Sequence, residues 1–358
     1  MNGKEFFFDL YAIPGMTEFR LKNLLARFET PEGILGAEID ALVKVEGVNE
    51  KLAQAIVSYQ RSPELEKQMA TAQRLGAKVI SYLEDGFPEN LKGVAHMPPV
   101  LFARGEIREC DRLAVAVVGT RFPSPYGVQV AKRLGWELGK AGVTVVSGLA
   151  RGVDTYAHRG ALEAGGRTIA VLGCGIDVYY PPENRELCET IVKKGAVASE
   201  FPLGAEPLAM NFPKRNRIIS ALAQVVIAVE AGEKSGVLNT CAWAKEQGRM
   251  VFAVPGRIGD ERSLGTNRLI RDGARILTDT TDVLNWLGMM VQKEERIEIP
   301  VAEKEVPVLK VIDSEPKHID EICELVGMPM AKLLSLLFQM EVKGLVKQLP
   351  GKFFVREN

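Results

Sequence analysis

Basic residues stand beside glycines at several points between residues 117 and 217, each time near a run of apolar residues. The clearest segments are Val117-Val118-Gly119-Thr120-Arg121, Ser147-Gly148-Leu149-Ala150-Arg151-Gly152 and Phe212-Pro213-Lys214-Arg215-Asn216-Arg217. In an open parallel sheet, ligands bind outside the carboxyl ends of the strands, where backbone amides and arginine side chains suit a phosphate. The pattern therefore predicts a phosphate-bearing ligand.

The first segment offers three candidate contacts. Gly119 permits close approach of the backbone, Thr120 supplies a hydroxyl, and Arg121 supplies a planar pair of donors for phosphate oxygens. A surface salt bridge is the alternative role for Arg121. Ser124 is expected to cap the helix that follows.

The second segment contributes candidate contacts from the loop after another strand: Ser147, Gly148 and Arg151. Asp154 is expected to cap the next helix, and His158 lies four residues later on the same face. Such a pair could bind a metal or transfer protons. Since no third ligand is in view, a structural pair is favoured.

The third segment combines one aromatic ring with three cations: Phe212, Lys214, Arg215 and Arg217. Aromatic faces stack on unpaired bases while cations follow the phosphate backbone, so this composition favours single-stranded nucleic acid over a mononucleotide. Two bland alternatives remain. Phe212 could belong to the core, and Arg217 could pair with a carboxylate such as Glu200 or Glu230.

A further group, Lys234, Ser235 and Gly236, repeats the cation, hydroxyl and glycine at the start of a helix. No Gly-x-Gly-x-x-Gly or Walker lysine motif follows any strand, which disfavours nicotinamide cofactors and ATP. These loops contain no nucleophile paired with a base. We therefore expect a binding protein without a cofactor or metal, and not an enzyme.

The composition is that of an ordinary soluble protein of two or three domains, with 358 residues and 46% hydrophobic residues. Its net charge of -1 gives no global attraction to nucleic acid, so any such affinity must come from a local patch. Five cysteines without a Cys-x-x-Cys pair disfavour disulfides and zinc. Apolar runs fall short of the ~18 residues of a membrane helix, so we expect a cytoplasmic protein.

The elements expected to position these residues lie in a domain over residues 66–288. Near-continuous apolar runs, typical of strands buried on both faces, occur at 113–118, 143–146, 168–172, 225–229 and 250–254. Stretches of helical spacing, such as 128–140 and 239–247, alternate with them. This alternation predicts an α/β fold with a Rossmann-like, doubly wound, mostly parallel sheet.

An all-α domain is expected over residues 1–65, where a helix, glycine turn and helix occur twice, around Gly15 and Gly47. Thr17 and Asn49 can cap the second helix of each unit. The repeat resembles tandem helix-hairpin-helix (SAM-like) motifs, whose turn amides can hold a DNA phosphate. Acidic residues in the turns leave a purely structural role equally open.

The C-terminal part is expected to begin with a charged linker at 289–305. Helices at 308–312, 319–326 and 331–343 and a hairpin at 346–355 then predict a winged-helix domain over 306–358. Its recognition helix, 330–343, offers few donors for bases or phosphates. A protein-contact role is therefore favoured over DNA binding.

Taken in order, the strings of the central domain closely resemble the DprA (Smf) family of bacterial DNA-processing proteins. They are Val-Gly-Thr-Arg at 118–121, Ser-Gly-Leu-Ala-Arg-Gly-Val-Asp at 147–154 with His158, Tyr-Pro-Pro-Glu-Asn at 180–184, Ser-Glu-Phe-Pro at 199–202, Phe-Pro-Lys-Arg-Asn-Arg-Ile-Ile at 212–219, Glu-Ala at 230–231, Lys-Ser-Gly at 234–236 and Val-Pro-Gly at 254–256. The flanking helical and winged-helix domains match the family's longer members.

The resemblance implies a non-enzymatic, single-stranded DNA-binding protein that forms a homodimer through its Rossmann-like domain. It also implies protection of incoming DNA during natural transformation, loading of the recombinase RecA, and single-stranded DNA-binding protein as a further partner. The family's DNA contacts would fall on Arg121 with Gly119 and Thr120, and on Phe212 with the basic residues after it. Val237 departs from the family's usual small hydroxyl, which weakens the expectation for Ser235.

Two other functions are kept as alternatives. Nucleoside-monophosphate phosphoribohydrolases share a Rossmann-like sheet, but the segment Lys-Ser-Gly-Val-Leu-Asn-Thr at 234–240 lacks their glycines and their glutamate. An adaptor that recruits RecA with weak DNA affinity of its own would lack the steep salt dependence of a phosphate-binding patch.

Overall fold

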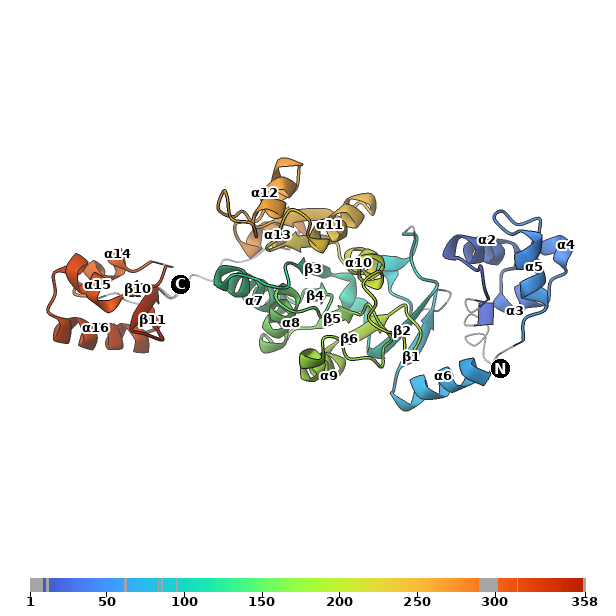
Figure 1. Cartoon of the computed structure of the whole chain (residues 1–358), viewed down its shortest axis with the longest axis horizontal. Helices are drawn as coiled ribbons and strands as arrows, with labels where there is room; N and C mark the ends of the chain where they lie inside the picture. Colours follow the sequence, from blue (N-terminus) through green and yellow to red (C-terminus); the bar gives the residue numbers. More distant parts are fainter. Residues whose placement is uncertain are drawn as a thin grey trace. The chain divides into compact units, whose positions relative to one another are not determined.

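The computed structural model describes residues 9–10, 13–60, 63–82, 84, 86–94, 96–289, 302–313 and 315–356. The chain divides into two compact units, Met1–Met289 and Met290–Asn358 (Figure 1). Most of the predicted linker, residues 290–301, lies outside the described residues. Within the described ranges, every helix is too short or too polar to cross a membrane.

The chain begins with a helical module: α2 (Glu18–Phe28), α3 (Pro31–Leu35), α4 (Ile39–Leu42), α5 (Glu50–Val57) and α6 (Pro63–Arg74). The predicted caps are confirmed. The Thr17 side chain accepts from the amide of Arg20, and that of Asn49 accepts from the amide of Leu52. Apolar residues of both helical units share one core, including Leu21, Leu24, Ile34, Leu42 and Ile56. This is the expected helix-hairpin-helix arrangement.

The sheet of the first unit has nine strands: β1 (Lys78–Ser81), β2 (Val100–Gly105), β3 (Ala114–Val118), β4 (Thr144–Ser147), β5 (Thr168–Val171), β6 (Ala196–Ser199), β7 (Val225–Ala228), β8 (Met250–Ala253) and β9 (Arg275–Ile276). Their order is β1-β2-β6-β5-β4-β3-β7-β8-β9. In the spatial order from β6 through β5, β4, β3, β7 and β8 to β9, every neighbouring pair is parallel. Strand β2 pairs antiparallel with both β1 and β6. The predicted doubly wound, mostly parallel sheet is confirmed.

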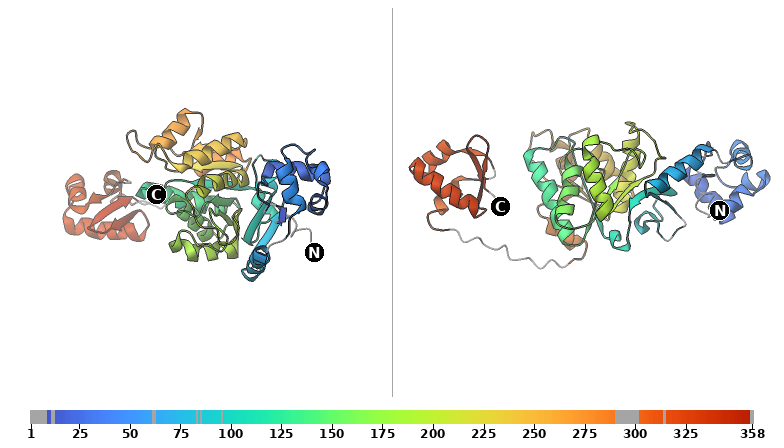
Figure 2. Two further views of the ribbon diagram at one scale, coloured as in Figure 1. Left: turned by 45° about the vertical axis from the view of Figure 1, so that its right-hand side comes forward. Right: turned by 90° about the horizontal axis from the view of Figure 1, so that it is seen from below.

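Helices cover both faces of this sheet (Figure 2). On one face pack α7 (Pro125–Lys140), α8 (Val153–Glu163), α9 (Arg185–Lys194) and α13 (Thr280–Trp286). On the other pack α10 (Asn211–Leu222), α11 (Gly236–Glu246) and α12 (Leu264–Arg271). The strands between them are almost entirely buried, as their continuous apolar runs predict.

The strand order reverses between β3 and β7, so the connections after these two strands diverge at the switch point of the sheet. Backbone hydrogen bonds join the ends of the two strands, from the Val229 amide to the Val118 carbonyl (3.0 Å) and from the Thr120 amide to the Glu230 carbonyl (2.8 Å). The loops after β3, β4, β5 and β7 therefore share one edge of the sheet.

The second unit is a winged-helix domain with α14 (Val306–Val311), α15 (Ile319–Val326) and α16 (Met330–Val342). Strands β10 (Lys317–His318), β12 (Phe353–Arg356) and β11 (Val346–Leu349) form a small antiparallel sheet in that order. The predicted helices and hairpin are confirmed. The two-residue strand β10 is an addition that no sequence pattern indicated.

Candidate nucleic-acid interface

The glycine and cation segments, far apart in sequence, meet at the carboxyl edge of the sheet. Arg215, in the first turns of α10, donates a hydrogen bond from Nη1 to the Gly148 carbonyl after β4 (2.7 Å) and another to the Val171 carbonyl at the end of β5. Arg121, after β3, reaches the ring of Phe212 in the first turn of α10. Helix α10 thus brings its amino terminus against three strand ends.

At this point lies an aromatic and cationic group that we call the Phe212 cluster: Arg121, Tyr180, Phe212 and Arg215. The Phe212 and Tyr180 ring centroids are 5.5 Å apart, with their planes tilted by 41°. The Cζ atoms of Arg121 and Arg215 lie 5.1 Å and 5.9 Å from the Phe212 centroid, within the range of cation–π attraction. Phe212 is only partly buried, so the cluster is reachable from solvent.

Two cations of this region, Arg121 and Lys214, are exposed and form no ion pair with any residue that the structure describes. Lys214, Arg215 and Arg217 occupy the first two turns of α10, where the helix dipole disfavours positive charge, and no acidic residue stands in the first turn. An external anion would relieve this electrostatic conflict. The amino end of α10 therefore has the charge distribution of an anion-binding site.

Arg215 itself is buried and fixes the loops from below. Burial lowers its pKa to about 10, against the opposing effect of Asp154, so the guanidinium stays charged at neutral pH. A Cβ atom on Gly148 would lie 2.5 Å from Arg215 Nη2, which explains why glycine occupies this position. Direct contact of Arg215 or Gly148 with a ligand would require the loops to rearrange.

Ser147 is fully buried, and its hydroxyl donates to the Val117 carbonyl at 2.7 Å. This side chain joins β4 to β3 inside the core. A direct contact between the Ser147 hydroxyl and a ligand, as the sequence suggested, would require that hydrogen bond to break.

The prediction that Asp154 caps its helix is wrong. Helix α8 has Gly152 at the N-cap position, and Asp154 stands inside the first turn. Its carboxylate instead accepts from the amides of Gly148 (3.0 Å) and Ala150 (3.4 Å). Burial raises the pKa of Asp154, while Arg215 acts in the opposite direction. Asp154 thus holds the loop after β4 in place.

His158 faces the core and not Asp154. Its Nδ1 lies 2.6 Å from the hydroxyl oxygen of Thr168, which itself donates to the Val145 carbonyl. The imidazole therefore donates through Nδ1, and Nε2 finds no partner among the described residues. Burial and Arg215 lower the pKa of His158 to about 3, so it is neutral. Both side chains lie in structural surroundings, but they are held by different groups and do not form the structural pair that the sequence favoured.

Two of the candidate cations are held by carboxylates. Arg217 makes a two-point ion pair with Glu200, at 2.6 Å and 2.8 Å, and both side chains are mostly buried. This confirms the alternative pairing that the sequence left open. Arg151 pairs with Glu183 at the surface, with Nη2 3.1 Å from Oε2, and this hydrogen bond lowers the pKa of Glu183. Because the carboxylate offsets the positive charge, each ion pair attracts a phosphate less strongly than a free cation would.

Backbone packing explains Gly119 and Thr120. A Cβ on Gly119 would lie 2.4 Å from Cγ2 of Val153, so the glycine lets α8 approach the strand end. The Thr120 hydroxyl accepts from the amide of Phe122 at 3.2 Å and shapes the turn. Both residues remain partly accessible at the sheet edge.

The amino terminus of α7, the usual phosphate site of a Rossmann-like fold, is already occupied. Ser124 caps the helix as predicted and accepts from the Gly127 amide at 3.0 Å. The buried carboxylate of Glu230 accepts from the Ser124 amide at 2.9 Å and from its hydroxyl. A Cβ on Gly127 would lie 2.4 Å from Glu230 Oε2, so this glycine makes room for the protein's own carboxylate. A dinucleotide phosphate cannot bind there.

The remaining candidates begin α11. Ser235 caps this helix by accepting from the Val237 amide at 3.3 Å, and Lys234 is exposed without an ion pair to any described residue. Gly236 is exposed, and its carbonyl accepts from Asn216 of α10 at 3.4 Å. The amino ends of α10 and α11 are thereby linked along the same edge.

Tyr180, Phe122 and Arg262 were not singled out from the sequence. Tyr180 completes the Phe212 cluster, and its place in the Tyr-Pro-Pro-Glu-Asn string was the available signal. Phe122 follows Arg121 directly and is 77% exposed. Arg262 donates to the Phe122 carbonyl at 3.3 Å, a contact between residues 140 apart in sequence.

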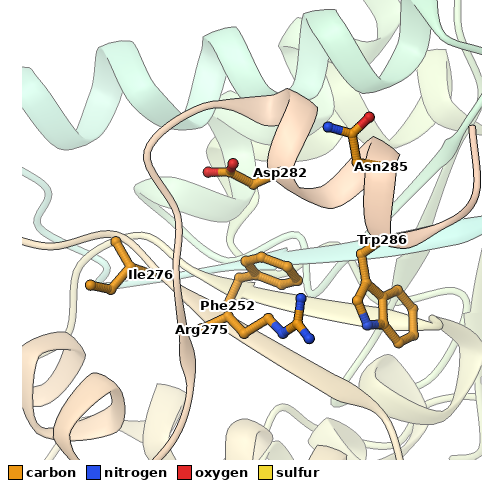
Figure 3. Close-up of a pocket in the computed structure, with 6 residues that line it drawn as sticks. All are labelled: Phe252, Arg275, Ile276, Asp282, Asn285 and Trp286. Atoms are coloured by element: carbon orange, nitrogen blue, oxygen red, sulfur yellow. The ribbon is translucent and has the colours of Figure 1, made fainter. Parts of the chain in front are cut away.

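A separate cavity of about 340 Å³ lies at the edge strand β9, lined by Phe252, Arg275, Ile276, Asp282, Asn285 and Trp286 (Figure 3). Ile276 and Trp286 are large apolar residues that remain exposed there. The strand order places β9 three strands from β3, away from the Phe212 cluster.

The fold and the site together define a class: a Rossmann-like domain with aromatic and basic side chains at its strand ends, preceded in the sequence by a helix-hairpin-helix module and followed by a winged helix. Family models agree with this description. DNA recombination-mediator protein A matches residues 78–288, the DprA winged-helix domain 292–352, and the SAM-like helix-hairpin-helix tandem 7–59. The chain belongs to the DprA (Smf) family of DNA-processing proteins.

Individual relatives support this assignment. Protein Smf of Synechocystis is 31% identical over 383 residues, which cover 96% of each chain. DNA processing protein DprA of Streptococcus pneumoniae is 44% identical over 57% of this chain and 72% of that protein. The X-ray structure of the S. pneumoniae protein aligns with TM-score 0.70 and 35% identity, over 80% of this chain and 98% of that chain.

A second solved structure is that of DNA processing protein A from Helicobacter pylori, a study of its single-stranded DNA binding mode. It aligns with TM-score 0.54 and 32% identity, over 59% of this chain and 95% of that chain.

Proposed function

We propose that this protein binds single-stranded DNA along the carboxyl edge of its sheet, with the Phe212 cluster at the centre of the site. The observation that carries the proposal is Arg121, which is exposed and makes no ion pair among the described residues, over the ring of Phe212 and beside the cation-rich amino end of α10. A ring can stack on an unpaired base while the cations contact its flanking phosphates. The binding mode studied in the H. pylori relative supports the same ligand.

We propose a division of the candidate residues by role, which their exposure and pairing support. Direct contacts are assigned to the accessible side chains Arg121, Phe212, Lys214 and Lys234. Positioning roles are assigned to the buried or paired residues: Ser147, Gly148, Arg151, Arg215 and Arg217. Gly119, Thr120, Ser235 and Gly236 shape the turns and present backbone to the strand.

The test is a titration of labelled oligothymidine at several salt concentrations. Arg121→Ala removes charged hydrogen bonds worth about 1.5–3 kcal/mol, so affinity should fall roughly 10- to 150-fold. The slope of log affinity against log salt should decrease by about 0.7 for each cation removed.

Lys193→Ala is the matched control, because this exposed lysine lies in the last turn of α9, shortly before β6 begins at the opposite edge of the sheet. Unchanged affinity of Arg121→Ala would refute the DNA site. It would instead favour an adaptor with little DNA affinity of its own.

We further propose that the bound strand is passed to RecA, as the family resemblance implies, in the cytoplasm and during uptake of transforming DNA. In this proposal the protein protects the incoming DNA and loads RecA onto it, with single-stranded DNA-binding protein as a further partner. The measurement is the DNA-dependent ATPase of RecA on strands coated with that protein. Wild type should shorten the lag before hydrolysis, and Arg121→Ala should not.

We propose that this function requires binding and no catalysis. The carboxylate nearest the switch point, Glu230, is buried and held by two hydrogen bonds to Ser124, so it is not free to act on a nucleotide. Incubation with AMP should release no adenine. Free adenine would instead support the phosphoribohydrolase alternative.

The homodimer is proposed to form at the β9 edge of the sheet. Among the described residues, β9 is the last strand of the sheet and pairs on one side alone; exposed Ile276 belongs to it, and exposed Trp286 lines the same cavity (Figure 3). Unpaired edges flanked by apolar side chains favour association with another chain. Ile276→Glu should convert the dimer to a monomer in light scattering, and an unchanged mass would exclude this edge.

For the winged-helix domain we propose a protein contact. Helix α16 buries Leu333, Leu336, Leu337 and Met340 against its own domain. On its outer face it exposes Leu334, Phe338 and Val342, each one turn after the last. An apolar outer face on this helix is suited to protein and poorly suited to the polar groove of duplex DNA.

A further inference from the structure

The turn after β3 holds an exposed aromatic ring outside the Phe212 cluster. Phe122 is 77% exposed, although burying a phenylalanine ring would gain free energy. Its backbone is held on both sides: the Phe122 amide donates to the Thr120 hydroxyl, and the Phe122 carbonyl accepts from Arg262 Nε. A ring displayed in this way on a fixed turn is suited to stacking.

The loops around Phe122 are joined into one rim. The Thr120 amide donates to the Glu230 carbonyl at 2.8 Å, and the Ala231 amide donates to the Arg262 carbonyl at 2.7 Å. The Gly265 amide also donates to the Ala231 carbonyl at 2.7 Å. These bonds connect the turn after β3 with the loops after β7 and β8.

Two cations stand on this rim beyond Phe122. Lys234 is exposed and has no ion pair among the described residues. Arg262 is 51% exposed, and the one ion pair that it makes among the described residues, with Asp260, is long at 3.9 Å. The contacts connect Phe212 to Arg121, and Phe122, which follows Arg121 in sequence, to Arg262, so rings and cations alternate; Lys234 lies in the neighbouring loop after β7.

We propose that Phe122 is a second base-stacking platform, so that a strand bound at the Phe212 cluster continues over the turn after β3 to Arg262 and Lys234. This inference rests on the proposed DNA-binding function and extends its path. Alternation of rings and cations matches the alternation of bases and phosphates in a single strand. A protein partner would not require cations on both sides of the ring.

The experiment compares Phe122→Ala, Phe122→Trp and Arg262→Ala with wild type, using an oligothymidine of about 12 nucleotides. Loss of one stacked base should weaken binding of Phe122→Ala roughly 5- to 150-fold without changing the salt slope. Phe122→Trp should restore binding, because a larger ring also stacks. Arg262→Ala should lower the slope by about 0.7.

Trp136→Ala is the matched control, since this ring is 43% exposed and lies in the later turns of α7, toward the opposite edge of the sheet from the turn after β3. It should bind as wild type does. Thermal unfolding of each variant checks that the fold is kept, as expected for an exposed ring.

Wild-type affinity of Phe122→Ala would overturn the second platform. If Arg121→Ala still lost affinity, the proposed DNA site would stand and only its extension would fall. A Phe122→Ala protein that bound DNA normally but no longer stimulated RecA would show that the ring contacts protein, which also overturns the inference.

Discussion

The buried ion pair between Arg217 and Glu200 leads to a prediction that separates structural from DNA-facing cations. Arg217 is 13% exposed and Glu200 8%, with two N–O distances of 2.6 Å and 2.8 Å. Arg217→Met keeps much of the side-chain volume but leaves the carboxylate of Glu200 nearly buried without its partner. Breaking such a pair costs about 3–5 kcal/mol, and the remaining exposure favours the lower end.

A loss of about 3 kcal/mol should lower Tm by roughly 6–12 °C in a domain of this size. The assay is thermal unfolding of Arg217→Met, Glu200→Gln and the double variant. The double variant should recover most of the loss, since neither charge is then left alone. Folded Arg217→Met should retain the wild-type salt slope for oligothymidine.

A different outcome of the same two measurements would contradict the structural role of Arg217. A slope reduced by about 0.7 with an unchanged Tm would mean that Arg217 leaves Glu200 and faces a phosphate in solution. The assignment of Arg217 as a positioning residue would then be wrong.

Three further predictions concern residues behind the site. Gly148→Ala should displace Arg215, because the new Cβ would lie 2.5 Å from Nη2. The variant should lose about 1–3 kcal/mol of unfolding free energy, measured in urea, and should also bind DNA more weakly. Unchanged stability would show that the loop adjusts to the extra methyl group at little cost. Glu230→Ala should cost about 1–3 kcal/mol by leaving the Ser124 amide and hydroxyl unpaired, measured in the same way, and an unchanged midpoint would mean that water replaces the carboxylate. The pKa of His158 is about 3 in the folded state, whereas in the unfolded chain the imidazole binds a proton below about pH 6.5. The free energy of unfolding should therefore fall as the pH drops from about 6.5 toward 3. At pH 5 the loss is about 2 kcal/mol relative to pH 8, and His158→Asn should lack it; parallel pH profiles of the two proteins would contradict the burial of a neutral imidazole.

The parts of the fold that sequence could predict are those with long, uniform signals. Continuous apolar runs identified β3, β4, β5, β7 and β8, and helix caps at Thr17, Asn49 and Ser124 are confirmed. Strand β9 has only two residues and β6 reads Ala-Val-Ala-Ser, so neither gives a strong hydrophobic signal. Their positions depend on pairing with neighbours that are distant in sequence.

For the site, sequence located the loops but not the role of each side chain. Three arginines of the site have the same side chain but different surroundings. Arg121 is exposed, Arg215 is buried against Gly148, and Arg217 is paired with Glu200. The difference comes from which carbonyl or carboxylate the fold brings near each guanidinium. Asp154 failed as a predicted cap for the same reason, because amides of the preceding loop reach its carboxylate first.

The contrast between two helix amino termini at the same sheet edge favours the proposed ligand, a nucleic-acid strand, over a dinucleotide cofactor. At α7 the positive end of the helix is neutralised by Glu230, which Gly127 admits, so the usual nucleotide site is closed by the protein itself. At α10 the positive end carries further cations and no acid in its first turn. The unbalanced positive charge therefore lies beside Phe212, at the ends of β4 and β5. There the aromatic ring could stack on an unpaired base. An anion drawn to that point meets a stacking surface as well as charge, and a single-stranded nucleic acid satisfies both along its length.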